Sequence, residues 1–140
     1  MEIIANAVQT VAANQNVYFT DSVASGGCSI EHRDGSGLVT LRGLSTTQSR
    51  ARFRVTFGAN VAISTGGTVA PISLSIALNG ETVPATTMTI TPAAVGDFFN
   101  VSSAVFIDIP TGCCTTISVK NISTQPIDVQ NSNLIVERVA

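Results

Sequence analysis

The chain has 140 residues, of which 11% are charged, and its formal net charge at pH 7 is −2. This length predicts one domain, and the small charged fraction and slightly negative net charge argue against a basic surface for nucleic acid. Hydrophobic residues make up 44% of the chain, which excludes the composition of disordered proteins, and no apolar run is long enough to cross a membrane as a helix.

Short β-strands separated by turns are predicted throughout, because β-branched valine, isoleucine and threonine far outnumber leucine. In the first half, Asp34-Gly35-Ser36-Gly37 has the glycine content of a four-residue hairpin loop. The segment Arg50–Phe57 alternates most clearly, with phenylalanine and valine on one face and arginine on the other. The predicted extended segments of this half are Ile3–Val11, Val17–Thr20, Cys28–Arg33, Leu38–Arg42 and Arg50–Phe57.

The second half continues the pattern of strands and turns. Asn79-Gly80 is a dipeptide that two-residue hairpin turns prefer, and residues 92–97 form a long corner. The predicted strands of this half are Ile72–Leu78, Thr86–Thr91, Phe99–Ile109, Cys114–Ile122, Ile127–Val129 and Leu134–Val139. We therefore predict about nine or ten strands and no helix. The expected fold is an all-β, single-domain antiparallel jelly-roll sandwich over residues 1–140, with residues 1–16 as a candidate extended N-terminal arm.

Several predicted strands lack the polar face of a solvated sheet. Small serine and alanine side chains alternate with the apolar residues of Ile72–Leu78. Near the C-terminus, Leu134 and Val136 share one face, while Ile135 and Val139 share the other. One sandwich of this size cannot bury both faces of several strands, so we predict that copies of the chain associate. The alternative is that serine and threonine occupy a solvated sheet as good strand formers.

Three arginines, Arg50, Arg52 and Arg54, share one face of a single predicted strand. Like charges about 7 Å apart repel one another and require water or acidic partners. The favoured interpretation is a solvated or intersubunit ladder of ion pairs, and the alternative is an anchor for an acidic surface on another protein. Candidate acidic partners are Glu2, Asp97, Asp108 and Glu137.

No catalytic, cofactor-binding or metal-binding residues are predicted, and we expect the chain not to be an enzyme. His32 is the single histidine, and about 13 Å of strand separates it from Cys28, too far for a nucleophile and its base. Cys28, Cys113 and Cys114 lack zinc-ligand spacing. We predict plain thiols, with a vicinal or Cys28-linked disulfide as the alternative. If Cys113 and Cys114 lie in a strand, one could be in the core and the other exposed.

The succession Phe106–Gly112, Ile117–Asn121 and Leu134–Arg138 resembles the last strands of tumour-necrosis-factor-like jelly rolls. This resemblance implies a compact trimer with its final strands at the threefold axis. More closely, the whole chain, from Met1-Glu2-Ile3-Ile4-Ala5-Asn6 onward, resembles small proteins encoded in phages and prophages of gut Firmicutes. It lacks the collagen-like tract that precedes the spore-surface members. The residues expected at the trimer contact are Phe106, Leu134, Ile135 and Val136.

These resemblances imply a non-enzymatic viral structural protein, a capsid decoration or cement protein that docks as a homotrimer on the virion. The alternative is a fibre-tip or surface module that binds carbohydrate or a host receptor. Expected partners are copies of the chain and the major capsid protein or another virion protein, without nucleic acid or membrane. Because no secretory signal begins the sequence, we expect synthesis in the host bacterial cytoplasm and localisation to the virion. The docking candidates are Arg50, Arg52, Arg54, Ile3, Ile4 and Val8.

Overall fold

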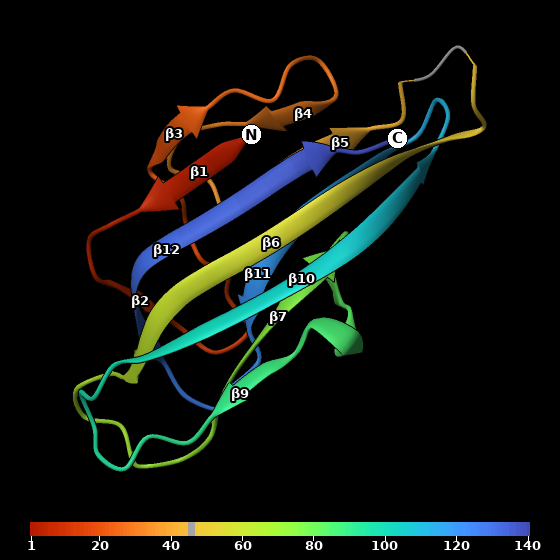
Figure 1. Ribbon diagram of the computed structural model, residues 1–140. Helices are drawn as coiled ribbons and strands as arrows, with labels where there is room; N and C mark the ends of the chain where they lie inside the picture. Colours follow the sequence, from red (N-terminus) through yellow and green to blue (C-terminus); the bar gives the residue numbers. More distant parts are fainter. Residues whose placement is uncertain (45–46) are drawn as a thin grey trace.

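The computed structural model describes residues 1–44 and 47–140, which form two facing antiparallel sheets of six strands each. Sheet A lies in front of sheet B in Figure 1. The strands of sheet A, in spatial order, are β10 (Phe99–Pro110), β6 (Arg50–Ile63), β12 (Ile127–Arg138), β1 (Glu2–Ala5) and β3 (Asp21–Ala24), and β2 (Gln9–Val11) also pairs with β12. The strands of sheet B are β4 (Ile30–His32), β5 (Val39–Arg42), β11 (Cys114–Asn121), β7 (Ile72–Leu78) and β8 (Glu81–Thr82), and β9 (Met88–Ile90) also pairs with β7. The predicted all-β jelly-roll sandwich is confirmed.

The hydrophobic core fills the space between the two sheets. On β6, Phe53, Val55 and Phe57 are fully buried and point toward sheet B, as their alternation predicts. Phe19 packs edge-on against Phe57, with ring centroids 6.3 Å apart. Because side chains alternate along a strand, the arginines of β6 are on the opposite, outward face of sheet A.

Two strands of sheet A are longer than predicted. β6 continues to Ile63, six residues past the expected end at Phe57, because β10 and β12 pair with it on both sides. β12 runs unbroken from Ile127 to Arg138, where two strands were expected, and its pairing register with β6 shifts between Gln130 and Asn133. Tertiary pairing therefore overrides the weak strand preference of the glycine and asparagine residues in these segments.

The N-terminal segment is part of sheet A, contrary to the prediction of an extended arm over residues 1–16. β1 lies between β12 and β3, with Ile3 opposite both Leu134 and Ser22. Ile3 is fully buried in the core. Val17–Thr20 was predicted to be extended and lies outside the named strands, and the strand forms after it, at β3. The backbone N–H and C=O groups of β1 pair with β12 on one side and with β3 on the other. This pairing stabilises the segment as a strand of sheet A, because unpaired backbone groups of a buried apolar segment would be costly.

The second face of β7 is covered by the chain itself. Asn79 and Gly80 both have positive φ, as the predicted tight turn requires. After β8, a single 3₁₀ turn at Pro84–Thr86 interrupts the strand expected over Thr86–Thr91. Ser75 is fully buried, and its hydroxyl lies 3.1 Å from that of Thr86. The prediction that this strand is buried on both faces is confirmed, but its cover is this turn and not another copy.

Candidate functional site

The outward side of sheet A is formed by the three long strands β10, β6 and β12, which lie side by side in Figure 1. Strand register aligns their outward residues in rows across the sheet. One row contains Phe106, Arg54 and Glu137, and the next contains Ala104, Thr56 and Ile135. We call this surface the outer face. Its residues are Arg50, Arg52, Arg54, Thr56, Gly58, Asn60, Asn100, Ser102, Ala104, Phe106, Asp108, Gln130, Asn133, Ile135 and Glu137.

The middle of the outer face carries exposed apolar side chains next to the charged residues. Phe106 is 63% exposed and Ile135 is 38% exposed. Between their strands, β6 contributes Arg54 opposite Phe106 and Thr56 opposite Ile135, and the next outward residue, Gly58, is small. An exposed phenylalanine beside small residues forms a flat patch on which a second protein surface could pack.

One end of the outer face is a ladder of ion pairs between neighbouring strands. Arg52 binds both carboxylate oxygens of Asp108, with Nε–Oδ1 at 2.8 Å and Nη2–Oδ2 at 3.1 Å. Arg50 reaches the same carboxylate through Nε at 3.5 Å, and Arg54 pairs with Glu137. The predicted ladder is confirmed, and its acidic partners are two of the four expected candidates.

The hydrogen-bonded pair Arg52–Asp108 shifts the pKa values of both partners. The hydrogen bond from Arg52 is the main cause that lowers the pKa of Asp108, and the positive charge of Arg50 adds to the effect. The same hydrogen bond raises the pKa of Arg52. Both changes favour the charged forms, so the pair stays ionised across the neutral pH range.

The structure divides the expected trimer-contact residues into two groups. Phe106 and Ile135 are exposed on the outer face. Leu134 and Val136 point into the core and are fully buried, so they are not available to another copy, contrary to the prediction. Both faces of this segment are apolar, and the sequence pattern does not specify which one covers the core.

The docking candidates at the N-terminus are divided in the same way. Ile3 lies in the core and cannot dock on a partner, which corrects that prediction. Ile4 is half-buried in β1, opposite Asn133 of β12. Val8 is 51% exposed in the connection between β1 and β2. Of these three, only Val8 presents most of its side chain to solvent.

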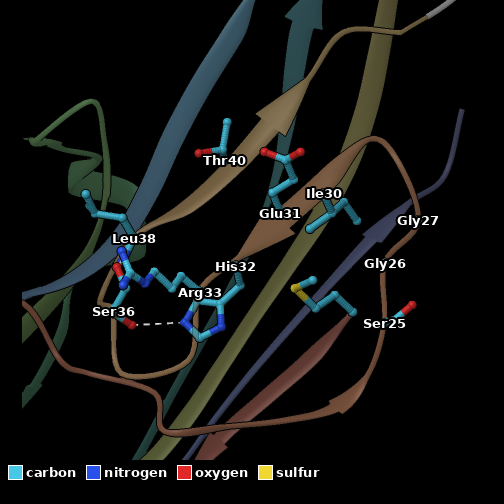
Figure 2. A pocket seen from close by; sticks show the side chains of 11 residues that line it. Ser25, Gly26, Gly27, Ile30, Glu31, His32, Arg33, Ser36, Leu38 and Thr40 are labelled. Atoms are coloured by element: carbon cyan, nitrogen blue, oxygen red, sulfur yellow. Dashed lines mark hydrogen bonds between the residues drawn. The ribbon is translucent and has the colours of Figure 1, made fainter.

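A shallow groove of about 590 Å³ lies beside the β4–β5 hairpin, and Figure 2 shows the side chains that line it. The His32 side chain is fully buried there, and its Nε2 donates to the Ser36 carbonyl at 3.0 Å. Its Nδ1 has no hydrogen-bond partner within the described residues and lies 3.7 Å from Asp34 Oδ1. The groove combines polar groups of both signs, including Glu31 and Arg33, and sequence reasoning did not find it.

The three cysteines are free thiols on the surface. Cys28, Cys113 and Cys114 are all exposed. The expectation that one of the adjacent pair could lie in the core is wrong, because Cys113 is in the turn between β10 and β11 and Cys114 begins β11. Across residues 1–44 and 47–140, no three histidine, cysteine or acidic side chains group as metal ligands would. No helix within those residues has the length and apolarity needed to cross a membrane.

Comparisons with known proteins identify the fold. No protein-family model matches the sequence, and no curated protein matches it. The globular domain of the zebrafish complement 1qA protein superposes with a TM-score of 0.64 at 11% identity, covering 96% of this chain and 93% of that one. Murine APRIL, in a crystal structure at pH 5.0, gives a TM-score of 0.58 at 12% identity, covering 95% of this chain and 96% of that one. The chain therefore has the jelly-roll fold of the C1q and tumour-necrosis-factor type, which confirms the predicted resemblance at the level of fold.

Proposed function

We propose that this chain is a non-enzymatic structural protein that assembles as a homotrimer through the part of the outer face of sheet A around Phe106 and Ile135. The observation that carries this proposal is the exposure of Phe106, at 63%, on the outer face, where Arg54 on the neighbouring strand already pairs with Glu137. Covering one phenylalanine side chain stabilises a contact by about 1.5–3 kcal/mol. A closed trimer would bury three copies of this side chain at once, which supports a stable assembly.

The edge of sheet A adds support for association at this surface. β10 is the edge strand, and it runs for 12 residues with β6 as its single strand neighbour in sheet A. A long edge strand with few charges is a site where another chain can approach. Asp108 is the charged residue in β10, and Arg50 and Arg52 already pair with it. Arg54, directly opposite Phe106, is paired with Glu137. A neighbour that packs beside Phe106 therefore meets an arginine whose charge is already paired.

The setting that we propose for the trimer is the surface of a virion, where it would decorate or cement the capsid. This part of the proposal is supported by the resemblance of the whole chain to small phage and prophage proteins. The partner would be the major capsid protein or another virion protein, bound after synthesis in the host bacterial cytoplasm. A trimer offers three copies of each docking surface, so weak single contacts add up to tight binding.

Replacing Phe106 by aspartate tests the assembly. We expect Phe106→Asp to convert the trimer to monomers, because the charge would have to be buried in the contact. Size-exclusion chromatography with light scattering measures the mass. The matched control is Val69→Asp, which changes an exposed apolar side chain in the connection between β6 and β7.

The control should remain a trimer. A wild-type chain that is monomeric at high concentration would contradict the proposed assembly. The virion setting has a separate test, in which mass spectrometry of purified particles should detect the chain in fixed proportion to the capsid protein. Its consistent absence from particles would refute decoration and leave the assembly intact.

A surface binding module is the second candidate function, and the groove beside His32 favours it. A volume of about 590 Å³ is in the range of small-ligand sites. Its donors and acceptors suit a hydroxyl-rich ligand, although the lining residues shown in Figure 2 offer no aromatic ring besides the imidazole. Glycan-array binding that is lost in Arg33→Ala would favour this function over decoration.

A further inference from the structure

We propose that a second groove, at the ion-pair end of the outer face, binds an acidic segment of a protein partner through Arg50. This groove has a volume of about 560 Å³ and is lined by Gln48, Ser49, Arg50, Arg52 and Ala140. It lies where β6 begins and β12 ends, the upper right of sheet A in Figure 1. The inference rests on the proposed docking function and names the surface and the chemistry that would serve it.

Within the described residues, the five side chains of the ion-pair ladder carry one more positive charge than negative charge. Three arginines of β6 face two carboxylates, since Arg54 pairs with Glu137 while Arg50 and Arg52 share Asp108. The local balance is therefore +3 − 2 = +1, on a chain whose net charge is −2. A local positive charge on an otherwise slightly acidic chain favours an acidic partner at this surface.

Arg50 is the guanidinium that carries this spare capacity. Arg52 occupies both oxygens of Asp108 at hydrogen-bond distances, whereas Arg50 reaches that carboxylate through Nε alone, at 3.5 Å. The Arg50 side chain is 58% exposed, and within the described residues Asp108 is its single ion-pair partner. A guanidinium has five N–H donors in a planar fork, so Arg50 can bind an incoming carboxylate through two parallel hydrogen bonds.

The surroundings of the groove favour a peptide over a free anion. The backbone N–H of Val139 donates to the Arg52 carbonyl at 2.8 Å, which holds Val139 beside the groove. Its side chain is 46% exposed and offers an apolar contact that phosphate or sulfate cannot use. One spare arginine is too few for a nucleic-acid backbone, which is bound by several cationic side chains at once. An acidic segment that also carries apolar side chains matches both features.

The test is fluorescence anisotropy with a fluorescein-labelled peptide of alternating glutamate and valine, and a glutamine–valine peptide as the neutral probe. We expect the full chain to bind the acidic peptide and not the neutral one. Arg50→Gln should weaken binding by about tenfold or more, because it removes the charged partner of the carboxylate. The matched control, Lys120→Gln, removes a partly exposed cation from β11 in sheet B, outside both grooves, and should change affinity by less than about twofold.

Three outcomes would overturn the inference. Equal loss in Arg50→Gln and Lys120→Gln would mean general charge attraction, and no binding of the acidic peptide would remove the site. Inorganic phosphate that binds as tightly as the peptide would indicate a simple anion site. Light scattering on the same samples separates this test from the test of the proposed assembly. Monomers that retain Arg50-dependent binding would refute the trimer alone. Trimers that do not bind the peptide would refute the groove alone.

Discussion

At the scale of single residues, Gly43, which follows β5, lies in close contact with the backbone of Pro110. A Cβ added at Gly43 would lie 2.2 Å from the backbone oxygen of Pro110. At Gly58, in the middle of β6, the nearest atom to an added Cβ is the Val101 oxygen at 4.0 Å. The first glycine is therefore required by the approach of two backbones, whereas the second is not.

These two glycines make a matched pair of variants. We expect Gly43→Ala to lower the free energy of unfolding by about 1–3 kcal/mol, because the backbone must shift to admit the methyl group. Gly58→Ala should leave stability unchanged or slightly higher. Urea denaturation of both variants measures the difference, and equal stability of the two would show that the contact at Gly43 relaxes without cost.

Asp108 predicts an acid-sensitive contribution to stability. Its pKa is lower in the folded chain than its ordinary value of 3.8, chiefly because Arg52 donates to it. The stabilisation is therefore fully present above about pH 4 and is lost as the pH falls through the lowered folded-state pKa. Between pH 5 and pH 2, the wild-type chain should lose more unfolding free energy than Asp108→Asn. Parallel pH profiles of the two proteins in urea denaturation would contradict this.

At the scale of elements, the buried second face of β7 depends on a hydrogen-bonded threonine. The Thr86 hydroxyl accepts from the Ile76 backbone N–H at 3.0 Å and donates to the Val83 carbonyl at 2.7 Å. This residue is fully buried. The 3₁₀ turn thus uses one side chain to satisfy backbone groups of β7 where the sheet ladder is interrupted.

Replacing this threonine by the isosteric valine tests that role. Thr86→Val should cost about 1–3 kcal/mol, because buried backbone groups lose their partner while the volume is kept. The control is Thr89→Val on the neighbouring strand β9, whose hydroxyl meets Ser73 at 3.0 Å on the surface and can be replaced by water. Thermal unfolding measures the midpoint temperature of both variants against the wild-type chain. A midpoint of Thr86→Val equal to that of the wild-type chain would exclude this role of the threonine.

The prediction of individual elements succeeded where the information was local. The alternation of Phe53, Val55 and Phe57 indicated the buried face of β6. The dipeptide Asn79-Gly80 indicated the tight turn between β7 and β8. The ends of β6 and the continuity of β12 were not predicted. Those limits depend on hydrogen bonds to strands that are distant in the sequence, and local preference contains no information on such partners.

At the scale of the whole molecule, the apolar surface is distributed differently from the prediction. Ile3, Leu134 and Val136 cover the core, and the turn containing Thr86 covers β7. What one copy leaves exposed on the outer face is concentrated at Phe106 and Ile135. The proposed trimer thus depends on a smaller apolar patch than the sequence predicts, and Phe106→Asp is correspondingly its most direct test.

The sequence by itself determined the fold class, the turns and which side chains share a face of each strand, because the two-residue period of a β-strand is local. It also identified the arginine row and four candidate acidic partners, of which the structure pairs Asp108 and Glu137 with it. Only the tertiary structure decided which apolar face of a strand meets the core, where the N-terminal segment pairs, and which arginine keeps spare hydrogen-bonding capacity. These properties depend on strand order and register, which arise from contacts between segments far apart in the chain.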